Sequence, residues 1–397
     1  MPNRTDRADS PPNAATSPGP RRRLATAAVA FAFWITMAGT TAPTPLYPVY
    51  GEEFGFSPIT VTVIFAVYAL GVVVGLLAFG RLSDQVGRRP VLVSATLLSV
   101  GAAGVFLTAD DVAVLLVARV LTGAATAALT ELLPPEGRVR PATLALFANM
   151  GGLACGTLLV GILADVAPAP LRTPWIVMLA LAAIGLVGVA STRETATHRS
   201  GLTLRFQPLR IPSEIRSDFL RSAMTAGAGF AVLGVLTAVT GLFLGTVLHR
   251  SSHTLTGLVV FTAFAGTALG QLLVRRIKPG AALRVACQGL ILAAALIALA
   301  MATTSLTPLL VGAAVNGLAT GIALGHGLGD ITTRGNPQHR GASVSTFFAI
   351  LYSMLAVPAI GVGVLIRATS LRPAGTIFSA AVALLALTVL LSLVLTR

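Results

Sequence analysis

Twelve long apolar runs constrain what this chain can fold into more than any other feature. Each run holds about 20 residues with little or no charge, and a helix of that length spans the hydrocarbon core of a bilayer. Hydrophobic residues make up 55% of the chain and charged residues 11%. A water-soluble fold has too few charged residues here to cover so much apolar surface. We therefore predict an all-α polytopic membrane protein with helices at 24–46, 57–79, 90–108, 112–133, 142–164, 174–191, 218–245, 254–274, 282–302, 306–328, 342–366 and 373–396.

The longest charge-rich interior segment divides these runs into six and six. The expected organisation is a disordered cytoplasmic tail at 1–23, an N-terminal half at 24–191, a cytoplasmic central loop at 192–217 and a C-terminal half at 218–397. The fourth runs of the two halves are alike, because LLVARVLTGAAT (115–126) and LLVGAAVNGLAT (309–320) share Leu, Leu, Val, Gly, Ala and Thr. This repeat predicts two six-helix pseudo-repeats around a central cavity.

The distribution of basic residues predicts the orientation. With the N-terminus in the cytoplasm, 23 of the 28 Lys and Arg residues fall on the inner side of the membrane. That bias is the one that membrane topology requires, and it places both termini in the cytoplasm. We expect the protein to lie in the cell membrane. Because the charge is spread over short loops, the formal net charge of +14 does not indicate a nucleic-acid partner.

One loop concentrates its charge in the string GRLSDQVGRRP (80–90). The string resembles the motif G-x-L-a-D-r-x-G-r-r/k of the major facilitator superfamily. The matching residues are Gly80, Leu82, Asp84, Gly87, Arg88 and Arg89, with Gln85 in place of the usual base. The resemblance implies a cytoplasmic latch, in which Asp84 faces the start of the eleventh helix and Arg88 pairs with Glu131. It also leads us to expect a monomer.

Arg119 is the only basic residue deep inside a run, and an intramembrane charge usually has a function. Thr122 and Thr126 share its helical face. The stretch from Leu115 to Ala125 resembles a second pattern of the same family, l-x-x-x-R-x-x-q-G-x-g, which implies a role in proton coupling. A structural arginine bonded to neighbouring carbonyls is the alternative. His326 is the second coupling candidate, since its charge can change near neutral pH, although it could equally be an interfacial hydrogen-bonding residue.

Glycines in the fifth run, GGLACGTLLVGIL (151–163), resemble the family's antiporter motif in part. Thr157 replaces the motif's proline, so export by antiport is only weakly implied, and a face of small residues for helix packing is the alternative. The eighth run carries similar glycines, and the fifth and eighth helices meet between the halves in this family. We therefore expect packing between the halves at Gly152, Gly156, Gly161, Gly266 and Gly270.

The family's cavity is lined by the first, fourth, seventh and tenth helices. Besides Arg119, the candidate cavity residues on these helices are Trp34, Met37, Thr41, Thr122, Thr126, Thr237, Thr240, Asn316 and Thr320. They are mostly apolar or hydroxyl-bearing, which suits amphipathic substrates. An asparagine in a membrane helix can also serve to hold helices together.

These features favour a secondary active transporter that works by alternating access. The expected activity is proton-coupled efflux of small amphipathic or drug-like compounds, with the lipid bilayer as its environment. An organic-acid or metabolite transporter is the near alternative, since Arg119 could anchor an anionic group. A membrane-embedded enzyme is remote, because the five histidines form no metal-ligand motif and no nucleophile–base pair is evident. No metal site and no cofactor are expected.

Overall fold

The structure, a computed structural model, describes residues 20–79, 86–131, 139–192 and 209–395. Within these residues all regular secondary structure is helical, and twelve helices are long and apolar enough to cross a membrane. The elements are α1 (Pro20–Thr41), η1 (Thr44–Leu46), α2 (Tyr47–Phe54), α3 (Pro58–Phe79), α5 (Arg88–Leu107), α6 (Val112–Glu131), α7 (Val139–Val166), α8 (Thr173–Ala190), η2 (Ser213–Ile215), α9 (Arg216–Thr246), α10 (His253–Leu273), η3 (Val274–Arg276), α11 (Pro279–Thr303), α12 (Leu306–Arg334), α13 (Arg340–Ala368) and α14 (Leu371–Leu395).

The predicted helices are confirmed, with three larger differences at their ends. The first helix ends at Thr41 rather than at 46, and η1 and α2 continue the segment to Phe54. The first helix begins at Pro20, so residues 20–23 of the expected tail are helical. The tenth helix continues to Arg334, beyond its expected end at 328. An ion pair between Asp330 and Arg334, one helical turn apart at 3.6 Å, supports this last turn.

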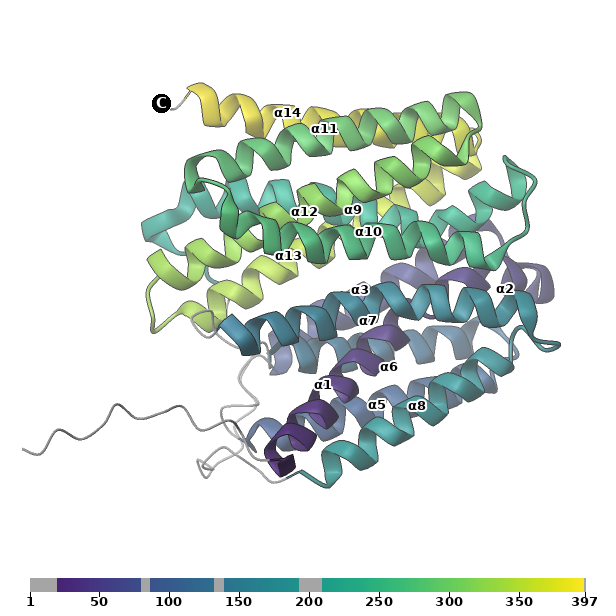
Figure 1. The fold of residues 1–397 in the computed structure, drawn as a ribbon. Coiled ribbons are helices and arrows are strands. Elements are labelled where there is room, and N and C mark those ends of the chain that lie inside the picture. The colour runs from purple at the N-terminus through teal and green to yellow at the C-terminus, as the bar shows by residue number, and fades with distance from the viewer. Residues whose placement is uncertain (1–19, 80–85, 132–138, 193–208, 396–397) are drawn as a thin grey trace, which may run out of the picture.

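The helices form two bundles, which Figure 1 shows one above the other. In the N-terminal bundle α3 packs on α6, α1 on α7, and α5 on both α6 and α8; in the C-terminal bundle α12 packs on α9, α10 and α11, and α13 packs on α9. The bundles meet where α7 contacts α10 and where α3 contacts α13. The start of α1 and the end of α14 lie at one end of the molecule (Figure 1), called here the terminal end. The other end of the molecule, where α2 lies, is called the opposite end.

The predicted repeat is visible in how the helices touch. A Cβ on Gly123 of α6 would lie 2.9 Å from the Cα of Gly71 in α3. A Cβ on Gly266 of α10 would lie 3.2 Å from the Cα of Gly317 in α12. These are the second and fourth membrane helices of each half, so each half brings the same pair of helices together through glycines.

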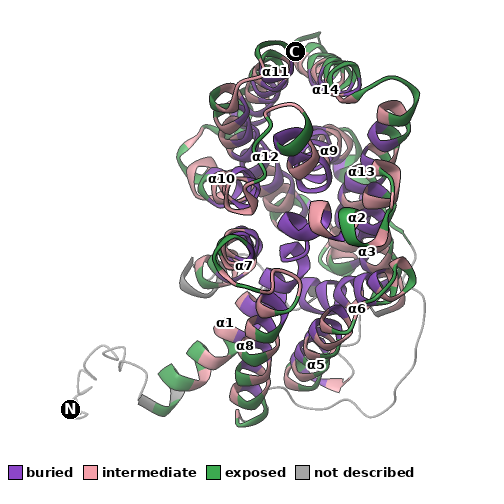
Figure 2. Cartoon of the chain, turned by 90° about the vertical axis from the view of Figure 1, so that its right-hand side faces the viewer, coloured by how far each residue is buried: buried purple, intermediate pink, exposed green. Residues whose placement is uncertain are grey.

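Large apolar side chains cover the outside of both bundles. Leu70, Val187 and Leu384 are 55%, 71% and 66% exposed, and Figure 2 shows exposed residues along the outer faces of the helices. An apolar outer surface is what lipid tails contact in a membrane protein.

Candidate functional site

Arg119 is the centre of the most unusual polar cluster among the described residues. Its side chain is completely buried, about 10 Å along α6 from the opposite end. One guanidinium nitrogen donates to the Thr40 carbonyl oxygen at 2.6 Å, and the other donates to the Tyr47 hydroxyl. Both acceptors belong to the first membrane helix and its extension, so Arg119 fastens that segment to α6.

Aromatic rings surround the same guanidinium. Its central carbon lies 5.4 Å from the ring centroid of Tyr68, 5.6 Å from that of Tyr47 and 6.0 Å from that of Phe65. A cation over the face of an aromatic ring is attracted by the ring's quadrupole. The rings therefore compensate part of the cost of burying the charge.

Within the described part of the chain, Arg119 has no carboxylate partner, and its Nε atom has no hydrogen-bond partner. A buried arginine is ordinarily paired with an acid, because an unpaired charge in low dielectric is costly. The cluster therefore leaves a net positive charge inside the bundle. It can attract an anion or repel a cation that comes close.

An aromatic contact joins the two halves beside this cluster. Tyr68 of α3 and Tyr352 of α13 meet edge to face, with ring centroids 6.3 Å apart, and Phe230 of α9 packs on Tyr352 at 6.1 Å. The Tyr68 hydroxyl faces the side chains of Thr126, Tyr352 and Thr40. Arg119 thus lies between this inter-half contact and the opposite end.

Between the Tyr68–Tyr352 contact and the opposite end, the halves approach each other closely. Thr157 of α7 donates to the Gly257 carbonyl of α10 at 3.2 Å. A Cβ on Gly363 of α13 would lie 2.2 Å from the Thr62 hydroxyl of α3. Figure 2 looks onto this end and shows α7 facing α10, α3 facing α13, and α2 between the bundles. The described contacts therefore close the opposite end.

The latch motif lies only partly within the described residues. Gly80, Leu82, Asp84 and the side chain of Glu131 fall outside them, so their expected contacts stay predictions. Gly87 precedes α5 with φ 95°, a value that favours glycine. Arg88 is exposed, and Arg89 donates to the carbonyl of Ala190, which ties α5 to the end of α8.

The second coupling candidate is not near the first. The His326 ring lies 3.4 Å from the Asp330 carboxylate, and Arg334 contacts Asp218 of α9 at 2.8 Å. His326 lies about 30 Å along α12 from the opposite end. Its cluster therefore belongs to the terminal end, well away from Arg119.

The candidate cavity residues do not converge on one site in this conformation. Four threonines donate to carbonyls of their own helix: Thr122 to Arg119, Thr126 to Thr122, Thr237 to Leu233 and Thr320 to Asn316. Such bonds satisfy a hydroxyl without any partner from another element. Of these four, Thr122 and Thr126 follow Arg119 on α6.

Other candidates hold helices together within one half. Thr41 donates to the Leu153 carbonyl of α7 at 2.7 Å, and Asn316 donates to the Gly229 carbonyl of α9 at 3.3 Å. Trp34 and Met37 pack against glycines of α7. The asparagine therefore acts between helices, as the alternative interpretation supposed.

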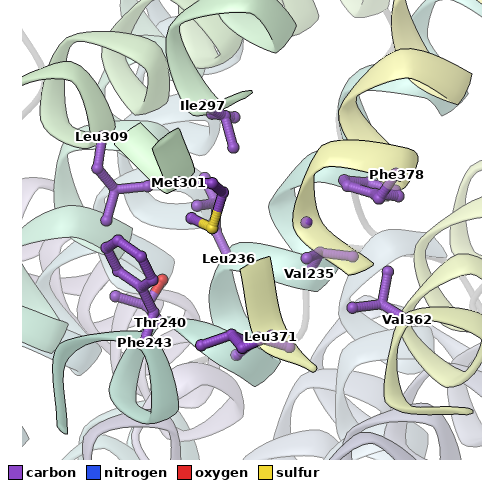
Figure 3. Close-up of a pocket in the computed structure, with 12 residues that line it drawn as sticks. Val235, Leu236, Thr240, Phe243, Ile297, Met301, Leu309, Val362, Leu371 and Phe378 are labelled. Carbon is purple, nitrogen blue, oxygen red and sulfur yellow. The ribbon is translucent and has the colours of Figure 1, made fainter. Parts of the chain in front are cut away.

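Thr240 lines a different cavity, of about 40 Å³, inside the C-terminal half. Figure 3 shows it among apolar side chains, which include Leu236, Ile297, Met301 and Phe378. The Thr240 hydroxyl has no hydrogen-bond partner among the described residues. This cavity lies within one bundle rather than between the two.

The expectation that five glycines pack between the halves is corrected for four of them. A Cβ on Gly152 would lie 2.3 Å from the Trp34 carbonyl oxygen, and one on Gly156 would lie 2.2 Å from that of Ala38. Both therefore pack on α1, within their own half. Gly266 and Gly270 pack in the same way on α12. Of the five, only Gly161 lies between the halves. A Cβ on Gly161 would lie 2.5 Å from the carbonyl oxygen of His253 in α10.

Sequence reasoning missed the partners of Arg119. Tyr47, Phe65 and Tyr68 come from segments far from it in the chain, and no local pattern marks them. One signal was present: the chain has only four tyrosines. Three of them, Tyr47, Tyr68 and Tyr352, gather in or beside this cluster.

Comparison with known proteins agrees with this architecture. The family model of the Major Facilitator Superfamily matches residues 29–360. The inner membrane transport protein YnfM of Escherichia coli (strain K12) is 40% identical over 55 residues, which are 14% of this chain and 13% of that protein. The matched stretch is thus a small part of both proteins.

Three solved structures share the fold over nearly the whole chain. The human organic anion transporter MFSD10 (TETRAN) has a TM-score of 0.68 at 17% identity, covering 94% of this chain and 100% of that one. The nucleoside transporter NupG has a TM-score of 0.70 at 12% identity, covering 93% and 99%. A bacterial homologue of the human lysosomal transporter Spinster, in an inward-facing and occupied conformation, has a TM-score of 0.64 at 15% identity, covering 96% and 97%.

Proposed function

Since this chain belongs to the Major Facilitator Superfamily and is a transporter rather than an enzyme, we propose that it is a secondary transporter that works by alternating access. Its preferred activity in this proposal is export of small amphipathic compounds in exchange for protons. The terminal end faces the cytoplasm, the opposite end faces outward, and the protein works as a monomer in the cell membrane.

The observation that carries the proposal is a buried Arg119 that has no carboxylate partner among the described residues. It lies between the Tyr68–Tyr352 contact and the closed opposite end. A membrane protein tolerates such a charge when the charge has a function. In alternating access, opening the opposite end separates the two halves at Tyr68 and Tyr352. That movement changes the surroundings of Arg119 during each cycle.

In this proposal the transported proton is carried by a group other than Arg119. A guanidinium stays protonated in proteins, so Arg119 cannot itself carry the transported proton. Its field disfavours a second positive charge close to it, so a cationic substrate that approaches Arg119 is destabilised there. The proposed proton carrier is the His326–Asp330 pair at the terminal end, where the ring and the carboxylate lie 3.4 Å apart.

Transport of organic anions is the second candidate, and the same residue favours it. Arg119 has no carboxylate partner in the described residues, and the guanidinium fork matches a carboxylate or phosphate. The structurally similar MFSD10 is named an organic anion transporter. On this alternative the substrate's anionic group replaces the Tyr47 hydroxyl or the Thr40 carbonyl as a partner of Arg119.

The test uses proteoliposomes that hold a pH-sensitive dye under an imposed proton gradient. Lipophilic cations, organic anions and neutral drugs are added in turn to the wild type and to Arg119→Ala. Arg284→Ala is the matched control, because Arg284 is half-buried on α11 and donates to the Gly280 carbonyl of its own helix, the one hydrogen bond of its side chain within the described residues. We expect proton movement with cations or neutral drugs, lost in Arg119→Ala and kept in Arg284→Ala.

Each class of result separates the candidates. Proton movement triggered by organic anions alone would favour the second candidate. Uptake of labelled compound without any proton response would contradict proton coupling. Equal transport by wild type and Arg119→Ala would contradict a role for Arg119 in transport.

A further inference from the structure

A carboxylate from one half holds the start of a helix in the other half at the opposite end. Asp165, near the end of α7, accepts hydrogen bonds from the backbone N–H groups of His253 and Thr254, both at 2.9 Å. It also accepts one from the Ser252 hydroxyl at 3.0 Å. These three donors form the first turn of α10 and its N-cap.

The same turn is tied to a second segment of the N-terminal half. The His253 ring nitrogen Nδ1 lies 2.9 Å from the carbonyl oxygen of Pro45 in η1. Gly161, one turn before Asp165 in α7, packs directly against the His253 backbone. Two segments of one half therefore meet on a single helical turn of the other.

The chemistry of this contact is that of a helix cap. The first N–H groups of a helix have no partner within the helix, and the helix dipole places partial positive charge there. A carboxylate satisfies both, and here it comes from the other half of the protein. The bonds exist only while α7 and α10 stay together, so they stabilise the state in which this end is closed.

We propose that Asp165, Ser252, His253 and Thr254 form an outer latch that sets how often the opposite end opens. The proposal rests on the alternating access of the proposed function and adds the residues that bias it. Asp165 is a positioning residue here, since it acts through α10 and need not touch the substrate.

The chain contains a matched control for this contact. Asp111 lies at the same end and accepts a hydrogen bond from the Val114 backbone N–H at 2.8 Å, in the first turn of α6. Asp111 and α6 belong to the same half. Loss of Asp111 therefore removes a helix cap without removing a contact between halves.

The experiment measures distances between spin labels in proteoliposomes, with Cys155 and Cys287 replaced by alanine. One pair, Thr108→Cys and Thr376→Cys, reports on the opposite end, and the other, Ser191→Cys and Lys278→Cys, reports on the terminal end; all four positions are exposed. Asp165→Ala should raise the population with a longer opposite-end distance by roughly threefold to tenfold, the effect of losing a helix cap. The terminal-end distance should shorten in the same sample.

Two further variants make the result specific. Asp165→Asn keeps one acceptor oxygen and should give an intermediate shift. Asp111→Ala should leave both distances as in the wild type. Wild-type distances in Asp165→Ala, or an equal shift in Asp111→Ala, would overturn the latch.

Failure of the latch can be told from failure of the proposed function. A proton gradient should move the two distances of the wild type in opposite directions. If it does so and Asp165→Ala matches the wild type, alternating access stands and the latch is wrong. If no condition or variant moves either distance, alternating access itself is wrong.

Discussion

At the scale of single residues, Arg119 shows what local sequence can and cannot predict. Its burial and its position beside Thr122 and Thr126 follow from helical spacing and an apolar run, and the structure has both. Its partners Tyr47 and Tyr68 come from other helices, and which side chains meet there depends on how whole helices pack. The two threonine hydroxyls donate to carbonyls of their own helix, a choice that spacing cannot reveal. Their role in lining a substrate cavity stays a prediction.

Loss of the Tyr47 hydroxyl is predicted to lower the Tm and the proton response more than loss of the Tyr50 hydroxyl. Tyr47→Phe removes an acceptor from the buried guanidinium, and losing a hydrogen bond to a charged group costs about 1.5–3 kcal/mol. We expect a lower Tm in detergent and a weakened proton response. Tyr50→Phe is the control, because the Tyr50 hydroxyl accepts from the uncharged Trp175 indole. A larger effect in Tyr50→Phe than in Tyr47→Phe would contradict this role.

At the scale of elements, twelve helices could be predicted because the thickness of the bilayer fixes the length of an apolar run that spans it. Which faces of those helices touch could not. Gly266 and Gly270 were paired in expectation with Gly152 and Gly156, yet α10 packs these two glycines against α12, as α3 packs Gly71 against α6. Small residues indicate that a helix makes a close contact. Which helix it contacts depends on the arrangement of all the helices.

Gly156 is predicted to be essential for packing α7 on α1. A Cβ there would lie 2.2 Å from the Ala38 carbonyl oxygen, and overpacking of this kind costs about 1–3 kcal/mol. Gly156→Ala should therefore lower the Tm. Gly361→Ala, where no atom lies within 4 Å of the added carbon, should leave the Tm unchanged or raise it, since alanine favours a helix. A Tm of Gly156→Ala equal to that of the wild type would show that α1 and α7 separate easily.

At the scale of the whole molecule, the sequence predicts two similar halves, and the shared glycine contacts of α3 with α6 and α10 with α12 agree with that repeat. It does not predict which end is closed. The two ends compete through small differences in free energy between conformations, and those differences arise from single contacts such as the one between Asp165 and α10. A pattern of apolar runs is the same in every conformation.

Access to Leu46 tests the central claim of alternating access most directly. Leu46 is fully buried in η1, which contacts both α7 and α10. With Cys155 and Cys287 replaced by alanine, Leu46→Cys would be treated with a membrane-impermeant maleimide from the side of the opposite end. Ser191→Cys, exposed at the terminal end, controls for the integrity of the vesicles. We predict slow labelling of Leu46→Cys at rest and faster labelling under a proton gradient with a transported compound. Labelling at one unchanged rate, fast or slow, in both conditions would contradict alternating access.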